Sequence, residues 1–461
     1  MAFLKPLVNS WDVFDTLLTR FVLEPTQVFG FIDQRHPGQN FARRRMEAQA
    51  ALDRIGSPYV IYDIYRQMTE AGLATEVAAR LLAEEIATEK MLMLPVRAAV
   101  ERVFPNDLIV SDMYLPGEVI SAMLAEVCNL HCALPVIRSN WGKATGTIWP
   151  KILEHYVIRT HHGDNTAADG TMPRQFGIST VLLRDVALNE WEKTLLRLGL
   201  GQLALIQRES RLRSLRHNAG TYEKLAAGPY LGLLLGYCGH LAQRFGESAA
   251  FAFLSRDCDD LSRIFHTTFP SIRFCNIDLS RRLIRNPEND VTFAEALPAA
   301  CVLVDGVSTG RSVSALLGRL GRSGQAFHAL LFLDHLLETA PPVAPSSVFK
   351  SSDFGNRHYP LELLLQSPYP PVTAITGDPP SGGLIKNFGQ PELTAAELQV
   401  IGAKCETVTE FISSLRLRGL PRLTEAQNRG LMEAGLEAIL KADLEPLSFP
   451  SFAAREMFSP F

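Results

Sequence analysis

Short apolar runs alternate with stretches of helical periodicity in the first part of the chain. Runs typical of strands occur from Leu7 to Val13 and in the segments DLIVSD, LPVIRS, HHGDN and STVLL. Between about Pro25 and Val103, apolar residues recur instead at helical spacing. This alternation predicts a mostly parallel α/β sheet, with the long helical stretch inserted after the first strand.

A second alternating set follows a helical region that runs from about Asp185 to Arg244. Its strand-like runs are SAAFAFLSRD, IRFCNID, AACVLVDG and FHALLFLDH. Beyond Pro341 the chain is rich in proline and then helical, which indicates an appended cover rather than another sheet. We therefore predict an α/β protein with two Rossmann-like parallel-sheet domains: residues 1–205 with a helical cap at about 21–102, and residues 206–461 with a core at about 245–340 and a C-terminal helical cover at 341–461.

Composition and charge narrow the class of protein. The chain has 461 residues, of which 47% are hydrophobic and 20% charged, as in globular proteins. A net charge of −4 gives no general attraction to nucleic acid or anionic lipid, so we expect neither as a partner. The seven cysteines, an odd number in mostly apolar surroundings, are typical of reduced thiols in the cytoplasm. The longest apolar run, near GPYLGLLLGYCGHL, looks too short to span a bilayer, and the N-terminus lacks a signal-peptide pattern.

Polar side chains follow four of the predicted strands in the first domain. Because the carboxyl ends of parallel strands meet at one edge of a sheet, these groups should converge on one crevice. A carboxylate nucleophile, a hydroxyl and a lysine to hold phosphate, and further carboxylates to hold a hard cation would form a phosphoryl-transfer site. The groups are Asp12 with Asp15 and Thr16, Ser111 with Asp112, Lys143, and Gly163-Asp164-Asn165 followed by Asp169.

This set, in this order, resembles the haloacid dehalogenase-like (HAD) hydrolase superfamily. DVFDT matches its first motif, VSD its second, the GKATG lysine its third and GDNTAAD its fourth. The resemblance implies that Asp12 attacks phosphorus and that Ser111 and Lys143 neutralise the phosphoryl group. It further implies Mg²⁺ held around Asp12, Phe14 and Asp164, with Asp169 as a further ligand. Lys151 is a second choice for the lysine, and the helical stretch would be the mobile cap that closes the pocket.

One position departs from the family pattern. Family phosphatases usually have a second aspartate two residues after the nucleophile as general acid and base, and here that residue is Phe14. Proton transfer to the leaving group typically contributes about 10²–10⁴-fold, so Asp15 or a cap residue would have to substitute. A catalytically inactive domain is left open. Dehalogenation is less favoured because the lysine and carboxylate set equally suits phosphate, and because the second domain, described next, indicates phosphorylated sugars.

The segment AACVLVDGVSTGRSVSALLGRLG reads as a buried strand, a tight loop and a helix. Successive backbone N–H groups at a helix N-terminus form an anion cradle. The segment resembles the phosphoribosyl diphosphate (PRPP) loop of type I phosphoribosyltransferases, in which an acid binds the ribose hydroxyls and the turn binds the 5-phosphate. A second acidic residue is usual where this chain has Gly306, and a generic phosphate loop is the alternative. The matching residues are Asp305 at the strand end and Ser308, Thr309, Gly310 and Ser312 in the turn.

Two upstream segments support that resemblance. Arg256 and Asp257 end a predicted strand, where such transferases bind pyrophosphate. Arginines after the next strand suit a flexible loop that folds over the diphosphate and stabilises its charge; they are Arg281, Arg282 and Arg285. An acceptor hydroxyl also needs a base, for which Glu362 or His358 could serve.

A phosphoribosyltransferase joined to a phosphatase resembles the bifunctional ribofuranosyltransferases of bacterial polysaccharide synthesis. The resemblance implies transfer of 5-phosphoribosyl from PRPP to a glycan or lipid-linked glycan acceptor, followed by removal of the 5-phosphate, with Mg²⁺ as cofactor. The same two reactions on a small acceptor, in nucleoside-like metabolite synthesis, are one alternative. A phosphate-sensing scaffold without catalysis is another. The sequence leaves a homodimer open.

Overall fold

The chain folds into two compact α/β units. The structure, a computed structural model, describes residues 5–130, 136–138, 142–298, 300–378, 383–389, 393–442 and 444. One unit comprises Met1–Leu188 with Arg216–Asn218, and the other comprises Asn189–Leu215 with Ala219–Phe461. The boundary predicted after residue 205 falls inside helix α11 (Gly201–Ser214), which belongs to the second unit because it packs on α19 (Ala395–Arg418).

The first unit is built on a five-stranded parallel sheet, as the apolar runs predicted. Across the sheet the strands lie in the order β5-β4-β1-β6-β7. The first three of these strands in the sequence extend from β1 toward one edge and the last two extend toward the other, so the strand order reverses between β1 and β6. Trp149 and Ile152 of helix α8 pack against apolar residues of the three central strands on one face. The strands are β5 (Val136–Arg138), β4 (Leu108–Ser111), β1 (Leu7–Trp11), β6 (Val157–Gly163) and β7 (Ser179–Leu182), and the helices are α5 (Arg97–Val100), α6 (Gly117–Cys128), α7 (Gly142–Thr145), α8 (Ile148–His155) and α9 (Met172–Arg174).

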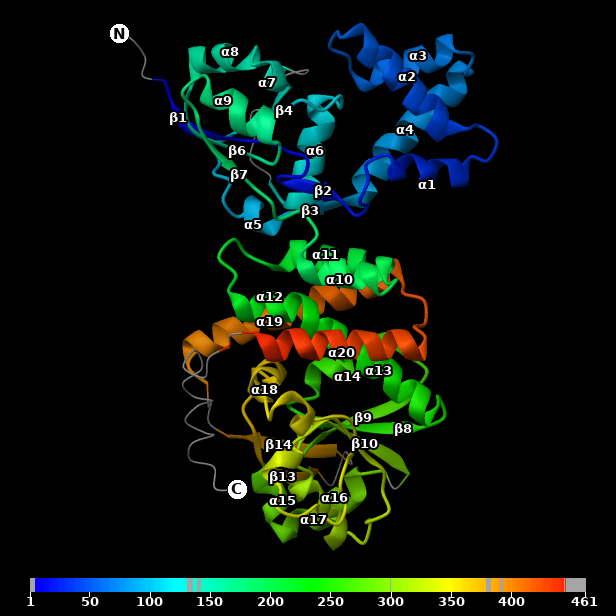
Figure 1. Cartoon of the computed structure of the whole chain (residues 1–461), viewed down its shortest axis with the longest axis vertical. Helices are drawn as coiled ribbons and strands as arrows, with labels where there is room; N and C mark the ends of the chain where they lie inside the picture. The colour runs from blue at the N-terminus through cyan, green and yellow to red at the C-terminus, as the bar shows by residue number, and fades with distance from the viewer. Residues whose placement is uncertain are drawn as a thin grey trace. The chain divides into compact units, whose positions relative to one another are not determined.

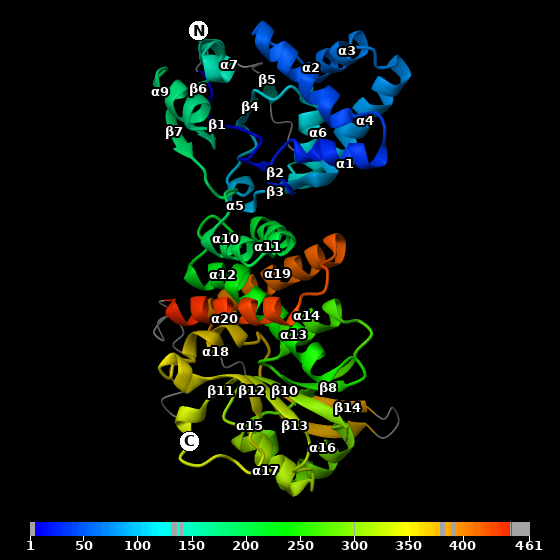
Figure 2. The same ribbon diagram turned by 45° about the vertical axis from the view of Figure 1, so that its right-hand side comes forward.

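Between β1 and β4 lies a helical bundle, drawn in blue in Figures 1 and 2. The predicted helical stretch 21–102 is not helical throughout, since β3 (Met93–Pro95) pairs antiparallel with β2 (Leu18–Arg20) at its base. Inside the bundle the guanidinium of Arg45 donates to Glu85 (2.9 Å), and both side chains are fully buried. The bundle helices are α1 (Gln27–Arg35), α2 (Phe41–Ile55), α3 (Ile61–Glu70) and α4 (Thr75–Leu92).

The second unit contains another five-stranded parallel sheet, ordered β12-β11-β10-β8-β9. Figures 1 and 2 show α15, α16 and α17 on one side of this sheet and α13 and α14 on the other. A separate antiparallel hairpin is formed by β13 (Val372–Asp378) and β14 (Gly383–Phe388). The sheet strands are β8 (Ala250–Ser255), β9 (Arg273–Asp278), β10 (Cys301–Ser308), β11 (Phe327–Phe332) and β12 (Ser346–Lys350), and the helices are α14 (Asp259–Thr268), α15 (Arg281–Arg285), α16 (Asp290–Ala296) and α17 (Arg311–Arg319).

Helices from both ends of this unit form a layer over the sheet. Helix α13 packs against α20, and α11 against α19, so the C-terminal helices do lie over the core. The predicted core boundary at 340 is wrong, because β12 pairs with β11 as an edge strand of the sheet. The apolar segment thought too short for a bilayer is in fact one continuous helix, Thr221–Phe245, long and apolar enough to cross one; its most apolar stretch is 94% buried inside the unit, as in a core helix. The further helices of this layer are α10 (Glu190–Arg197), α12 (Thr221–Leu225), η2 (Ala226–Tyr230), α13 (Leu231–Phe245), α18 (Tyr359–Leu365) and α20 (Glu425–Lys441).

Candidate active site

Three aspartates meet at the carboxyl edge of the first sheet, where the strand order reverses. Asp12 follows β1 directly and Asp164 follows β6 directly, and these two neighbouring strands flank the point at which open α/β sheets bind ligands. Asp169 lies in the short π-helix η1 (Thr166–Thr171), and its Oδ2 accepts the Asn165 N–H (2.9 Å). One carboxylate oxygen from each aspartate lies within 4.8 Å of the others.

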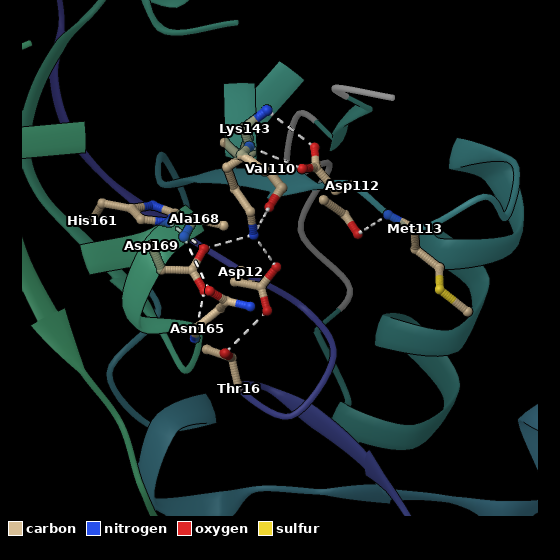
Figure 3. A network of polar contacts seen from close by, with 12 residues as sticks. Asp12, Thr16, Val110, Asp112, Met113, Lys143, His161, Asn165, Ala168 and Asp169 are labelled. Carbon is tan, nitrogen blue, oxygen red and sulfur yellow. Dashed lines mark hydrogen bonds and ion pairs between the residues drawn. The ribbon is translucent and has the colours of Figure 1, made fainter. Parts of the chain in front are cut away.

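The side chain of Lys143 reaches into this group from α7 (Figure 3). Its ammonium donates to Asp12 Oδ1 and forms an ion pair with Asp169 Oδ1 at 2.7 Å. Helix α7 is held in place by Asp112, whose carboxylate accepts the N–H groups of Lys143 and Ala144, both at 3.1 Å. Asp112 therefore anchors the helix that carries the lysine, a role that its position next to Ser111 in the sequence did not reveal.

Burial and mutual repulsion set the protonation of the carboxyl groups. Burial raises the pKa of Asp12 to about 7, against the opposing effect of the Lys143 ammonium and with a further rise from Asp169. Burial and the charge of Asp169 raise the pKa of Asp164 to about 6. For Asp169, burial is outweighed by the hydrogen bond with His161 and the charge of Lys143, and its pKa falls to about 2.

The donor set of this group fits a hard divalent cation. Asp12, Asp164 and Asp169 offer only carboxylate oxygens, the ligands that Mg²⁺ prefers. Three carboxylates beside one ammonium leave an excess of negative charge once they are ionised. A bound cation would favour the charged forms of Asp12 and Asp164 and so lower both raised pKa values.

A buried histidine that sequence reasoning missed orients Asp169. The Nε2 atom of His161 lies 3.1 Å from Asp169 Oδ1, and its Nδ1 lies 2.8 Å from the hydroxyl of Ser10. Burial lowers the pKa of His161, which favours the neutral ring that donates to the carboxylate from Nε2 and accepts from Ser10. A Cβ atom at Gly163 would overlap the Asp169 carboxyl group, so glycine is needed there for the close approach. Alternation in the strand did not indicate that His161 is buried, because His161 has the same parity as the exposed Val157 and Arg159.

Three residues that follow Asp12 closely in the sequence make different contacts. The hydroxyl of Thr16 donates to Asp12 Oδ2 (3.1 Å). Asp15 has a φ of 59° and accepts a hydrogen bond from Thr19 (2.6 Å), and its charge contributes to the raised pKa of Asp164. Phe14 has no side-chain ligand atom, and its ring lies under the guanidinium of Arg20 at 5.4 Å. The carboxylate cluster therefore forms without the Phe14 side chain.

Ser111 and Lys151 have different surroundings. Ser111 is buried as the last residue of β4, and its hydroxyl accepts the Met113 N–H (3.2 Å). It lies at the same sheet edge as the carboxylates. Lys151 is exposed on α8, so Lys143 occupies the lysine position of the group and Lys151 does not.

In the second unit, two acidic residues flank the corresponding reversal of strand order. Asp257 follows β8 and Asp305 lies in the neighbouring β10. Burial raises the pKa of the Cys258 thiol, and the charges of Asp305 and Asp257 raise it further. Both acids therefore lie near this one buried side chain. The prediction that β10 ends at Asp305 is wrong, because pairing with β11 continues to Ser308.

The turn after β10 is closed by its own hydroxyls. Ser308 Oγ accepts the Gly310 N–H (3.1 Å), and Thr309 Oγ1 accepts the Arg311 N–H (3.5 Å). Gly310 has a φ of +74°, and a Cβ there would lie 2.7 Å from Pro345. Ser312 is half-buried in the first turn of α17. The turn residues thus cluster at a helix N-terminus as predicted, with two of its N–H groups bonded to side chains.

The expected flexible arginine loop is instead a short helix. Helix α15 begins at Arg281 and is capped by Ser280, whose hydroxyl accepts the Leu283 N–H (3.2 Å). Leu283 and Ile284 are buried in the core, and this packing holds the segment in a helix. Arg282 and Arg285 are exposed on it.

Two further predicted residues, Arg256 and Glu362, lie in segments next to β8 and β10. Arg256 is half-buried between β8 and α14. Glu362 is half-buried in the first turn of α18. Leu365, at the end of α18, packs on Gly306, where a Cβ would lie 2.7 Å from its Cδ1. Helix α18 therefore packs against the carboxyl half of β10.

No protein-family model matches the chain, and a search of the curated proteins finds no match. The two clusters of polar residues, one in each unit, differ in their chemistry. The first combines a buried carboxylate, an ammonium and a cation-binding set, which suits attack on a phosphate ester. The second places two acids beside a hydroxylated turn at a helix N-terminus, which suits a phosphorylated polyol.

Proposed function

We propose that the first unit is a Mg²⁺-dependent phosphomonoesterase with a HAD-like core and an inserted helical cap. The observation that supports this most directly is the ion pairing of Lys143 with Asp12 and Asp169 beside Asp164. Asp12 attacks phosphorus and Lys143 compensates charge on the phosphoryl oxygens. Asp12, Asp164 and Asp169 would hold Mg²⁺, which, when bound, supplies further charge neutralisation.

The second unit, in the same proposal, transfers 5-phosphoribosyl from PRPP to an acceptor hydroxyl. Asp257 and Asp305 at the reversal of strand order, and the turn from Ser308 to Gly310, support a type I phosphoribosyltransferase-like assignment. Asp305 would bind the ribose hydroxyls and the turn the 5-phosphate. The bond from the anomeric carbon to pyrophosphate breaks as the bond to the acceptor oxygen forms, with inversion.

The two reactions act in sequence on one group. Transfer to a glycan or lipid-linked glycan yields a 5-phosphoribosyl glycan, and the first unit then hydrolyses the phosphate to leave a ribofuranosyl residue. Hydrolysis makes the overall route hard to reverse. A small acceptor would give a nucleoside-like product by the same chemistry.

A second candidate is a first unit that binds phosphate without turnover, which Phe14 favours. Its ring, under Arg20, fills the position at which phosphatases of the resembled family have a general acid. Turnover then requires another proton donor, and Asp15 is a candidate, since its charge acts on Asp164.

Mass spectrometry of a synthetic glycan incubated with PRPP, Mg²⁺ and protein tests the proposal. Wild type should add a dephosphorylated pentose, Asp12→Asn a pentose that keeps its phosphate, and Asp305→Ala none. The control is Asp290→Asn, because the Asp290 carboxylate is paired with Arg319 and belongs to neither proposed site. This variant should match wild type. If Asp12→Asn gives the unphosphorylated product, the role of the first unit is wrong; if wild type itself leaves the phosphate on, binding without turnover is favoured. Wild type that releases no pyrophosphate from PRPP with glycan or small acceptors would overturn the transferase.

A further inference from the structure

A turn at the end of β11 lies directly beside the phosphate-binding turn proposed above. Phe332, the last residue of β11, pairs with Ser308, and the Leu333 N–H donates to the Ser308 carbonyl (2.9 Å). The short 3₁₀ helix η4 (Asp334–Leu336) follows at once. Arg311, at the start of α17, donates to the Leu336 carbonyl (3.2 Å). The side chains of η4 therefore stand at the carboxyl edge next to the turn.

A hydrogen-bond chain fixes one of these side chains, His335. Ser351, in the 3₁₀ helix η5 (Ser351–Phe354), is fully buried and donates its hydroxyl proton to Asp334 Oδ1 (2.9 Å). Its oxygen lies 2.6 Å from His335 Nδ1. Hydrogen bonds from Ser351 and Ser352 outweigh burial and lower the pKa of Asp334 to about 2, so this carboxylate can only accept. Since the one hydroxyl proton of Ser351 goes to Asp334, the His335 Nδ1 must carry the proton donated to Ser351.

This arrangement leaves Nε2 of His335 as the basic atom of the ring. Within the described part of the chain, Nε2 of His335 has no hydrogen-bond partner, and the ring is half-buried. Burial lowers the pKa of His335, as does the nearby His358, while Asp334 raises it; the net effect keeps the ring neutral near pH 7. A neutral imidazole oriented by a hydroxyl and a carboxylate is the usual arrangement of a general base.

The two bases suggested by the sequence lie on the neighbouring segment that leads into α18. His358 lies with its ring centroid 5.3 Å from that of His335, and its Nδ1 lies 3.2 Å from the Asn356 carbonyl oxygen. Glu362 is one helical turn further along α18. His335 has both an orienting hydrogen-bond chain and a direct connection to the turn through Leu333.

We propose that His335 is the general base of the transfer reaction and removes the proton of the acceptor hydroxyl. This inference rests on the proposed transferase function of the second unit. As the acceptor oxygen bonds to the anomeric carbon, its proton passes to His335 Nε2, and pyrophosphate leaves with the electron pair of the broken bond. The imidazolium then returns the proton to solvent. Ser351 and Asp334 are positioning residues that hold the ring.

The test uses the full chain with His335→Asn, because the asparagine amide can keep the donor to Ser351 but has no basic nitrogen. The transfer rate to a hydroxyl acceptor should fall about 10²–10⁴-fold, while the dissociation constant for PRPP, measured by calorimetry, should stay within about threefold of wild type. Azide, a nucleophile with no proton to lose, serves as a second acceptor and should be used by variant and wild type at similar rates. His266→Asn, at an exposed position on α14, is the control and should match wild type.

The outcomes separate this inference from the function on which it rests. Equal loss with azide and with the hydroxyl acceptor, or weakened PRPP binding with unchanged turnover, would assign His335 a structural role. An unchanged transfer rate would also overturn the base role while leaving the transferase intact. Wild type that neither binds PRPP nor transfers pentose would remove both proposals together.

Discussion

Cation binding at Asp12, Asp164 and Asp169 should release protons in amounts that the structure sets. A ligand carboxylate must be ionised, so binding displaces any proton that Asp12, with a pKa of about 7, or Asp164, with a pKa of about 6, still holds. At about pH 6.5, Asp12 is roughly three quarters protonated and Asp164 roughly one quarter, which gives about one proton released per Mg²⁺. At about pH 8.5 both are ionised and release should be close to zero. Asp169, with a pKa of about 2, contributes at neither pH.

Isothermal titration calorimetry of Mg²⁺ in buffers of different ionisation enthalpy measures this number directly. Because the folded-state pKa values of Asp12 and Asp164 are raised, affinity should increase with pH and level off above about pH 8. Asp12→Asn removes the carboxyl group that supplies about three quarters of the released proton at about pH 6.5, so any Mg²⁺ that still binds should release only about a quarter of a proton. Binding without proton release at that pH, or affinity that falls as pH rises, would refute the electrostatic reasoning. Absence of binding at every pH would refute the cation site itself.

Two further predictions concern stability. Lys143→Met should lower the free energy of unfolding, measured by urea unfolding without divalent cations, by about 3–5 kcal/mol, because it leaves buried carboxylates unpaired. The control is Lys151→Met on the exposed face of α8, which should change this free energy by less than about 0.5 kcal/mol. Equal effects of the two substitutions would contradict the burial argument. Gly306→Ala should cost about 1–3 kcal/mol, since the new methyl lies 2.7 Å from Leu365 Cδ1. Leu365→Ala should make that change less costly in a double-mutant cycle, and simple additivity would show that the two residues do not press on each other.

The sequence correctly predicted the features that depend on a single strand and its direction. Apolar runs predicted both parallel sheets, and the acids that follow β1 and β6 meet because parallel strands end at one edge. The same logic placed Asp257 at the end of a strand, which is β8, and the structure pairs β8 with β10. It erred where pairing or packing from elsewhere decides: β11 extends β10 through Asp305 to Ser308, and buried Leu283 and Ile284 make a helix of the expected loop.

The sequence by itself determined the two-sheet α/β organisation and the acidic residues at the strand ends, since hydrophobic periodicity and strand direction are local properties. Only the tertiary structure decided which distant side chains serve them. His161 orients Asp169, Asp112 anchors the helix of Lys143, and Ser351 fixes His335, each through a hydrogen bond that no spacing in the sequence encodes. The physical reason is that burial and packing bring these groups together, and burial then sets their charge.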